Sequence, residues 1–143
     1  MKQEMTTYLK TIGITEHYLK RAREVYDFYS DFVGEDILDI FVCEYLDQEG
    51  ARHYESLWLF TQNYIMEAKS FLTRDDFDVA PIKKRIVFYA ITKENYDFKK
   101  ADDKSRMSVD MMLQYQFTCV FKASKENCDY LREILLKHIK TNI

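Results

Sequence analysis

A chain of 143 residues is long enough for one domain with a core of its own, and its 21 basic and 24 acidic residues give a formal net charge of -3. Apolar residues make up 47% of the chain and aromatic residues 15%, which excludes a disordered chain, and the charge balance provides no overall field for nucleic acid. With only three Gly and one Pro, the chain has no glycine-rich loop to hold a nucleotide.

The N-terminal third predicts a tail followed by one long helix. Residues 1–14 contain no apolar run of signal-peptide length and are expected to form the tail. From Thr15 the apolar residues recur every three or four positions, which predicts an amphipathic helix over residues 15–33 that Thr15 and Gly34 cap. The expected buried stripe comprises Tyr18, Ala22, Val25, Tyr29 and Phe32, widened by Leu19, Tyr26, Phe28 and Val33.

After Gly34 the apolar period changes to two, which predicts a sheet. The expected strands cover residues 37–46, 52–61, 64–71, 82–91, 94–98 and 108–122, and a turn through Gly50 joins the first two. In the last of these segments every second residue from Met111 to Phe121 is apolar, so one face should belong to a core. Residues 73–80 and 99–107 lack periodicity and are expected to form loops.

A second helix should close the chain. Ser124 is a suitable N-cap, and the expected buried stripe comprises Cys128, Leu131, Leu135 and Ile139, reinforced by Ile134 and Leu136. The three cysteines are odd in number, widely spaced and set in apolar runs, which favours buried free thiols in a reducing compartment. No segment approaches the length of a membrane span, so a cytoplasmic protein is expected.

The chain shows no signature of catalysis, of a metal site or of a cofactor. The motifs GxSxG, HExxH, GxxxxGK[ST], CxxC and GxGxxG are absent, and none of the three histidines has a second His or Cys at ligand spacing. The carboxylates of RDDFDVAPI, residues 74–82, lack the glycine and the closing glutamate of a calcium loop. We therefore expect a non-catalytic protein.

Two small sets of residues are candidates for a binding site. Arg52, His53, Lys83 and Arg85 could hold an anionic ligand, although solvated surface charge is the commoner use of such residues. Trp58 and Tyr64 could form an exposed aromatic contact with a partner, because aromatic residues dominate binding hot spots.

The order of elements and two stretches of sequence resemble the pleckstrin-homology (PH)-like superfold, including its GRAM and bacterial PH branches. LWLFTQNYI, residues 57–65, resembles a hairpin of that superfold, and FTCVFKASKENCDYLREILLKHI, residues 117–139, resembles its last strand and capping helix. The resemblance covers residues 36–140. It implies a single α+β domain over residues 1–143, in which a bent antiparallel sheet or barrel is plugged at one end by Leu131, Leu135 and Ile139. The helix at 15–33 is an addition to this fold.

The resemblance implies a binding or scaffold module that recognises a protein through a sheet edge, the terminal helix or the extra helix. PH-like domains that bind phosphoinositides use basic residues around the first strand-turn-strand. Here that region, FVCEYLDQEGARHYES, sets Arg52 and His53 against four carboxylates, so neither phosphoinositide nor membrane binding is expected; the carboxylates are Glu44, Asp47, Glu49 and Glu55. Two alternatives remain. A helix-grip α+β fold would enclose a small apolar ligand, and helix 15–33 could pair with its copy in a homodimer.

Overall fold

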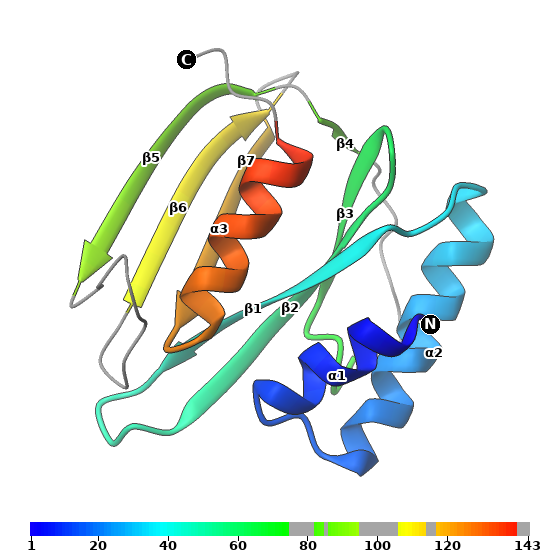
Figure 1. Cartoon of the computed structure of the whole chain (residues 1–143), viewed down its shortest axis with the longest axis horizontal. Helices are drawn as coiled ribbons and strands as arrows, with labels where there is room; N and C mark the ends of the chain where they lie inside the picture. The colour runs from blue at the N-terminus through cyan, green and yellow to red at the C-terminus, as the bar shows by residue number, and fades with distance from the viewer. Residues whose placement is uncertain (75–81, 85, 95–105, 114–116, 140–143) are drawn as a thin grey trace.

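The computed structural model describes residues 1–74, 82–84, 86–94, 106–113 and 117–139 (Figure 1). Two helices come first, α1 (Gln3–Thr11) and α2 (Glu16–Val33), and one helix, α3 (Asn127–His138), comes last. Between them lie β1 (Asp39–Leu46), β2 (Arg52–Phe60), β3 (Tyr64–Lys69), β4 (Ile82–Lys83), β5 (Ile86–Glu94), β6 (Arg106–Leu113) and β7 (Phe117–Ser124). The predicted α+β class, with an N-terminal and a C-terminal helix around antiparallel strands, is confirmed.

The described strands form two antiparallel sheets. One has the order β1-β2-β3-β4 and the other the order β5-β6-β7. The two sheets approach each other at β1 and β7, where the Lys122 amide donates a hydrogen bond to Cys43 Sγ (3.2 Å). Helix α3 packs against both of these strands.

The sheet of β1, β2 and β3 is buried on both faces and separates two cores. Because side chains alternate along a strand, Ile40 and Val42 of β1 pack with α1 and α2, whereas Phe41 and Cys43 pack with β6, β7 and α3. The other residues of β1 to β3 alternate in the same way, so the continuous apolar runs of these strands contribute side chains to both cores. Figure 1 shows α1 and α2 beside this sheet, with α3 and the second sheet on the other side of the molecule.

The expected tail over residues 1–14 was wrong. Residues Gln3–Thr11 form α1, and Met5, Leu9 and Ile12 are almost fully buried against the first sheet. The helix has only nine residues, too few to be stable by propensity alone, so its apolar face is held by the core that it covers.

Helix α2 confirms the prediction over residues 15–33, and Gly34 ends it in the left-handed conformation (φ +69°). Thr15 occupies the N-cap position, although its side chain makes no capping hydrogen bond. The buried stripe is narrower than expected and comprises Leu19, Ala22, Val25, Tyr26 and Tyr29. Tyr18, Phe28 and Phe32 were wrongly assigned to it and are exposed at the flank of the helix.

Three strand predictions need correction. Segment 82–91 contains two strands, β4 and β5, which belong to different sheets. Segment 108–122 is the hairpin of β6 and β7 rather than one strand, and Met111 pairs with Cys119 across it. Partners in this hairpin differ by an even number of residues, so the apolar alternation of the sequence keeps the same phase in both strands and gives no sign that there are two. Segment 94–98 lies outside the described residues apart from its first position, at the end of β5.

The end of the chain mostly follows the prediction. Leu131 and Ile139 of the predicted stripe are buried, and Leu135 packs against the same core. Leu136 was wrongly placed there, since its exposed fraction is 73%. Ser124 was wrongly assigned as the N-cap: it ends β7, and Glu126 precedes the first turn of α3. Cys43, Cys119 and Cys128 are buried free thiols, as predicted, and none of the described helices could cross a membrane.

Candidate functional site: the groove between α1 and α3

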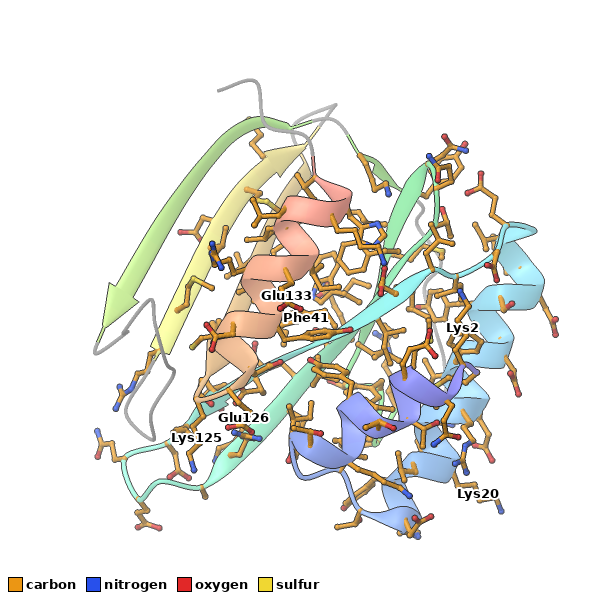
Figure 2. The ribbon with its side chains drawn as sticks, in the orientation of Figure 1. Lys2, Lys20, Phe41, Lys125, Glu126 and Glu133 are labelled. Atoms are coloured by element: carbon orange, nitrogen blue, oxygen red, sulfur yellow. The ribbon has the colours of Figure 1, made fainter. Side chains whose placement is uncertain are left out.

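A groove of about 370 Å³ runs between α1 and α3. Figure 2 shows Glu126 near the start of α3 and Glu133 further along the same helix. The groove is lined by α1 and the residue after it, and by the first half of α3 and the residue before it. The lining residues are Glu4, Thr7, Tyr8, Thr11, Ile12, Glu126, Asn127, Asp129, Tyr130 and Glu133. The volume lies within the range of ligand sites, at the lower end.

Two tyrosines form the aromatic part of the groove wall, one from each helix. The rings of Tyr8 and Tyr130 stack with their centroids 3.8 Å apart and their planes at 17°. Hydrogen bonds fix both rings, because the Tyr130 hydroxyl donates to the Ile40 carbonyl (2.8 Å) and the Tyr8 hydroxyl donates to Asn127 Oδ1 (2.7 Å). The Tyr8 hydroxyl also accepts a hydrogen bond from the Val42 amide (2.9 Å). The wall is therefore held in one geometry before any ligand arrives.

Beneath this wall lies a buried carboxylate, Glu44, which is fully inaccessible to solvent. The amide and the hydroxyl of Ser124 donate to it at 2.5 and 2.6 Å. Asn127 Nδ2 donates at 3.2 Å, and Arg52 Nε lies 3.3 Å away as an ion-pair partner. A buried charge requires such a set of donors to offset its lost hydration. Glu44 therefore ties β1, β2, β7 and α3 together and is not a surface charge of the first turn.

Arg52 links the same network to the end of α1. Its guanidinium donates to the Ile12 carbonyl (2.6 Å) and contacts Glu126 (3.3 Å) in addition to Glu44. The Tyr54 hydroxyl donates to the same carbonyl (2.6 Å). Gly13, which follows, has φ +91°, and a Cβ at this position would lie 2.8 Å from the Tyr54 hydroxyl oxygen. Glycine is required here because the turn is left-handed and closely covered.

The groove is electrostatically negative. Glu4, Glu126, Asp129 and Glu133 line it, and no Lys or Arg does so among the described residues. The pKa of Tyr130 is raised by burial and by the negative charges of Asp39, Glu133 and Glu4. The chemistry that suits such a groove is the binding of a positively charged group.

The predicted anion site at Arg52 and His53 is occupied by protein carboxylates. Arg52 is bound as described above, and His53 Nε2 lies 2.7 Å from Asp47 Oδ2 while its ring stacks on Tyr45. Both residues line a second hollow of about 420 Å³, together with Tyr18, Tyr54, Ser70, Leu72 and Thr73. Lys83 ends β4, but its side chain and the whole of Arg85 lie outside what the structure describes.

The predicted exposed contact at Trp58 was wrong. Only 2% of Trp58 is exposed, because β2 turns this side chain toward the second core, where its ring lies 4.5 Å from that of Phe121 between centroids. Tyr64 begins β3 and is half-buried. Neither residue lines the α1–α3 groove.

Sequence reasoning missed Tyr8, Asn127 and Tyr130. The spacing of Met5, Tyr8, Leu9 and Ile12 was the available signal for α1, but nothing in it indicates that the partner of Tyr8 lies 119 residues away. Across the described chain, no group of three or more His, Cys, Asp or Glu side chains is arranged to hold a metal ion.

A second polar cluster lies at the far end of α3, around the buried His138. Its Nε2 lies 2.5 Å from Asp39 Oδ2, its Nδ1 lies 3.1 Å from Lys84 Nζ, and its ring stacks on Phe60. Burial and the ammonium groups of Lys84 and Lys137 lower the pKa of His138, against the opposing effect of Asp39. Because Lys84 can only donate, neutral His138 accepts at Nδ1 and donates from Nε2 to Asp39. This cluster fastens the end of α3 to the start of β1.

No protein-family model matches the chain. No curated protein matches it either. Among solved structures, the chain is similar to the C-terminal domain of an unknown protein from Leishmania infantum, at 15% sequence identity and a TM-score of 0.48. The match covers 80% of this chain and 94% of that one. We draw neither fold nor function from this similarity.

Proposed function

We propose that the protein is a non-catalytic PH-like binding or scaffold module that holds a segment of a partner protein in the α1–α3 groove. The observation that carries the proposal is the groove itself, whose aromatic wall is fixed by hydrogen bonds to both helices and to β1. A preformed wall lowers the entropic cost of binding, since little has to be ordered when the partner arrives.

The PH-like part of the proposal is supported by the order of the elements. An antiparallel meander from β1 onward is followed by a single helix, and Leu131, Leu135 and Ile139 of this segment pack into the core between the sheets. The non-catalytic part is supported by Glu44, the buried carboxylate next to the groove. Its oxygens are already taken by Ser124, Asn127 and Arg52, which leaves it poorly placed to exchange a proton with a substrate.

A protein partner is favoured over a phosphoinositide because the basic residues near the first turn already have carboxylate partners within the protein. Arg52 and His53 each face a carboxylate at close range. An inositol polyphosphate would have to compete with these internal partners, and a polyphosphate needs several converging cations. A protein segment in the groove displaces none of them.

The test is selection from an unbiased random-peptide library, followed by mapping of the bound peptides with amide chemical shifts of the ¹⁵N-labelled protein. Enriched peptides should shift the amides of α1 and of the start of α3. A Thr7→Trp variant should abolish binding, because Thr7 lines the groove and its replacement fills it. Thr73→Trp, an exposed position in the second hollow, is the matched control and should leave binding unchanged. Equal binding to both variants would refute the groove as the site.

Flotation with vesicles that carry phosphoinositides provides the opposing arm. No association at physiological salt is expected. Specific association that persists at this salt would overturn the preference for a protein partner, since weak surface attraction is screened under these conditions.

A second candidate function, assembly of a homodimer through α2, is favoured by the exposure of Phe32. Its exposed fraction is 62%, and Phe28, one turn earlier on the same side, is 44% exposed. Sedimentation equilibrium should then show a mass that rises with concentration, and Phe32→Ser should hold the protein as a monomer. A constant monomeric mass for the unaltered protein would exclude this role.

A further inference from the structure

We propose that the segment bound in the α1–α3 groove is basic, and that an arginine side chain of the partner enters the groove between Glu4 and Glu133. The inference rests on the proposed function and adds the chemistry of the partner. It is carried by the combination of a groove, an aromatic wall and four carboxylates on its lining.

Part of the negative charge has a structural explanation. Glu126 is paired with Arg52, and Asp129 lies in the first turn of α3, where a carboxylate suits the positive end of the helix dipole. Glu4 holds the equivalent place in α1. These three positions alone would not demand a ligand.

Glu133 has no such explanation. It lies in the middle of α3, beyond the reach of the dipole effect, and both it and Glu4 form no ion pair with any described residue. Both side chains nevertheless line the same groove, and both, together with Asp39, contribute to the raised pKa of Tyr130. Two carboxylates on opposite helices thus line one groove, and neither has a described cation within ion-pair distance.

Arginine fits this space better than other cations. Its planar fork of N–H donors can serve carboxylates on two sides of the groove, and its aliphatic stem can lie along the apolar part of the lining. A bare metal ion fits poorly, since the described residues hold no cluster of three carboxylate, imidazole or thiol ligands. Lysine would satisfy the charge, but its single ammonium group has no planar fork to serve two carboxylates at once.

The test uses a short fluorescein-labelled peptide that contains arginines and its twin, in which citrulline replaces each arginine. Citrulline keeps the shape of the side chain and removes its charge. The arginine peptide should bind at low ionic strength and shift the amides that line the groove, and the citrulline twin should bind about tenfold more weakly, since charge-assisted hydrogen bonds are lost.

The protein variant that isolates the site is Glu4→Gln combined with Glu133→Gln. These side chains have no ion-pair partner among the described residues, so the only expected cost to stability is the loss of about 0.3–1 kcal/mol of helix-dipole interaction at Glu4, which thermal unfolding can verify. Binding of the arginine peptide should fall about tenfold. Asp27→Asn combined with Asp31→Asn changes the net charge by the same amount on the exposed face of α2 and should leave binding unchanged.

The outcomes separate the two proposals. Library-selected peptides that occupy the groove but are insensitive to Glu4→Gln/Glu133→Gln would refute the basic partner and leave the binding module standing. Equal loss of binding in the Asp27/Asp31 variant would also refute it, because the attraction would then be a property of net charge. Failure of every peptide, selected or designed, to enter the groove would overturn the proposed function itself.

Discussion

Removal of the Tyr8 hydroxyl by Tyr8→Phe is the sharpest test of how α1 is attached. The substitution keeps the ring, its stacking on Tyr130 and its burial, and it deletes one oxygen atom. That oxygen donates to Asn127 Oδ1 at 2.7 Å and accepts from the Val42 amide at 2.9 Å. The change therefore leaves a buried donor on β1 and a buried acceptor on α3 without partners.

The expected loss follows from these two groups. A buried polar group left unsatisfied costs about 1–3 kcal/mol, and Asn127 is still held by Val42 O and by Glu44, so it cannot turn freely to recover the bond. We expect the free energy of unfolding to fall by about 2–4 kcal/mol. For a chain of this size that corresponds to a fall in Tm of roughly 7–13 °C.

Urea unfolding followed by Trp58 fluorescence and by circular dichroism measures this loss. Tyr18→Phe is the matched control, because Tyr18 is partly exposed and has no hydrogen bond to a described residue; its effect should stay within about 0.5 kcal/mol. If Tyr8→Phe were also within about 0.5 kcal/mol of the unaltered protein, the polar attachment of α1 to β1 and α3 would be refuted.

The remaining predictions concern His138, α3 and the thiols. Because the pKa of His138 is lowered in the folded state, the unfolded chain binds more protons than the folded chain below about pH 6.5. Acidification should therefore reduce the free energy of unfolding by up to about 1.4 kcal/mol per pH unit, and urea unfolding between about pH 7.5 and 5.5 should show this slope. In His138→Asn the part of the slope that comes from His138 should disappear. Leu131→Ala should cost about 2–5 kcal/mol, whereas Leu136→Ala should stay within about 0.5 kcal/mol, and equal costs would contradict the orientation of α3. Burial raises the pKa of the Cys43, Cys119 and Cys128 thiols to about 12 each. Alkylation at about pH 8 should therefore be at least about 100-fold slower in the native protein than in urea, and rapid labelling of the native protein would contradict the burial of these thiols.

The fold was predictable where the physical signal is local. Helix α2 has a long apolar period and a left-handed Gly34 at its end, and the turn of β1 and β2 passes through Gly50 at φ +84°. The hairpin of β6 and β7 was not predictable as two strands, since its even pairing keeps the apolar alternation in the same phase in both strands. Helix α1 was missed because its stability comes from the sheet on which it packs.

The candidate site was mostly hidden because its contacts are distant in sequence. In the sequence Glu44 looks like an ordinary polar residue of a strand. Its burial depends on hydrogen-bond donors from Ser124 and Asn127, which lie about 80 residues later. Arg52 and Trp58 were recognised as unusual residues, but their use depends on which way β2 faces after a bulge between β1 and β2. Local patterns carry no information on either point.

The bond between Tyr8 and Asn127 also sets an order of events during synthesis. Helix α1 leaves the ribosome before α3, and the partner of its buried hydroxyl is made 119 residues later, a delay of about 6–24 s at ordinary rates of translation. During this interval the apolar side of α1 can pack on the sheet once β1 to β3 have formed, but Asn127, the hydrogen-bond partner of Tyr8, has not yet been made. The nascent chain therefore holds α1 in a provisional position until α3 has been made and fixes it.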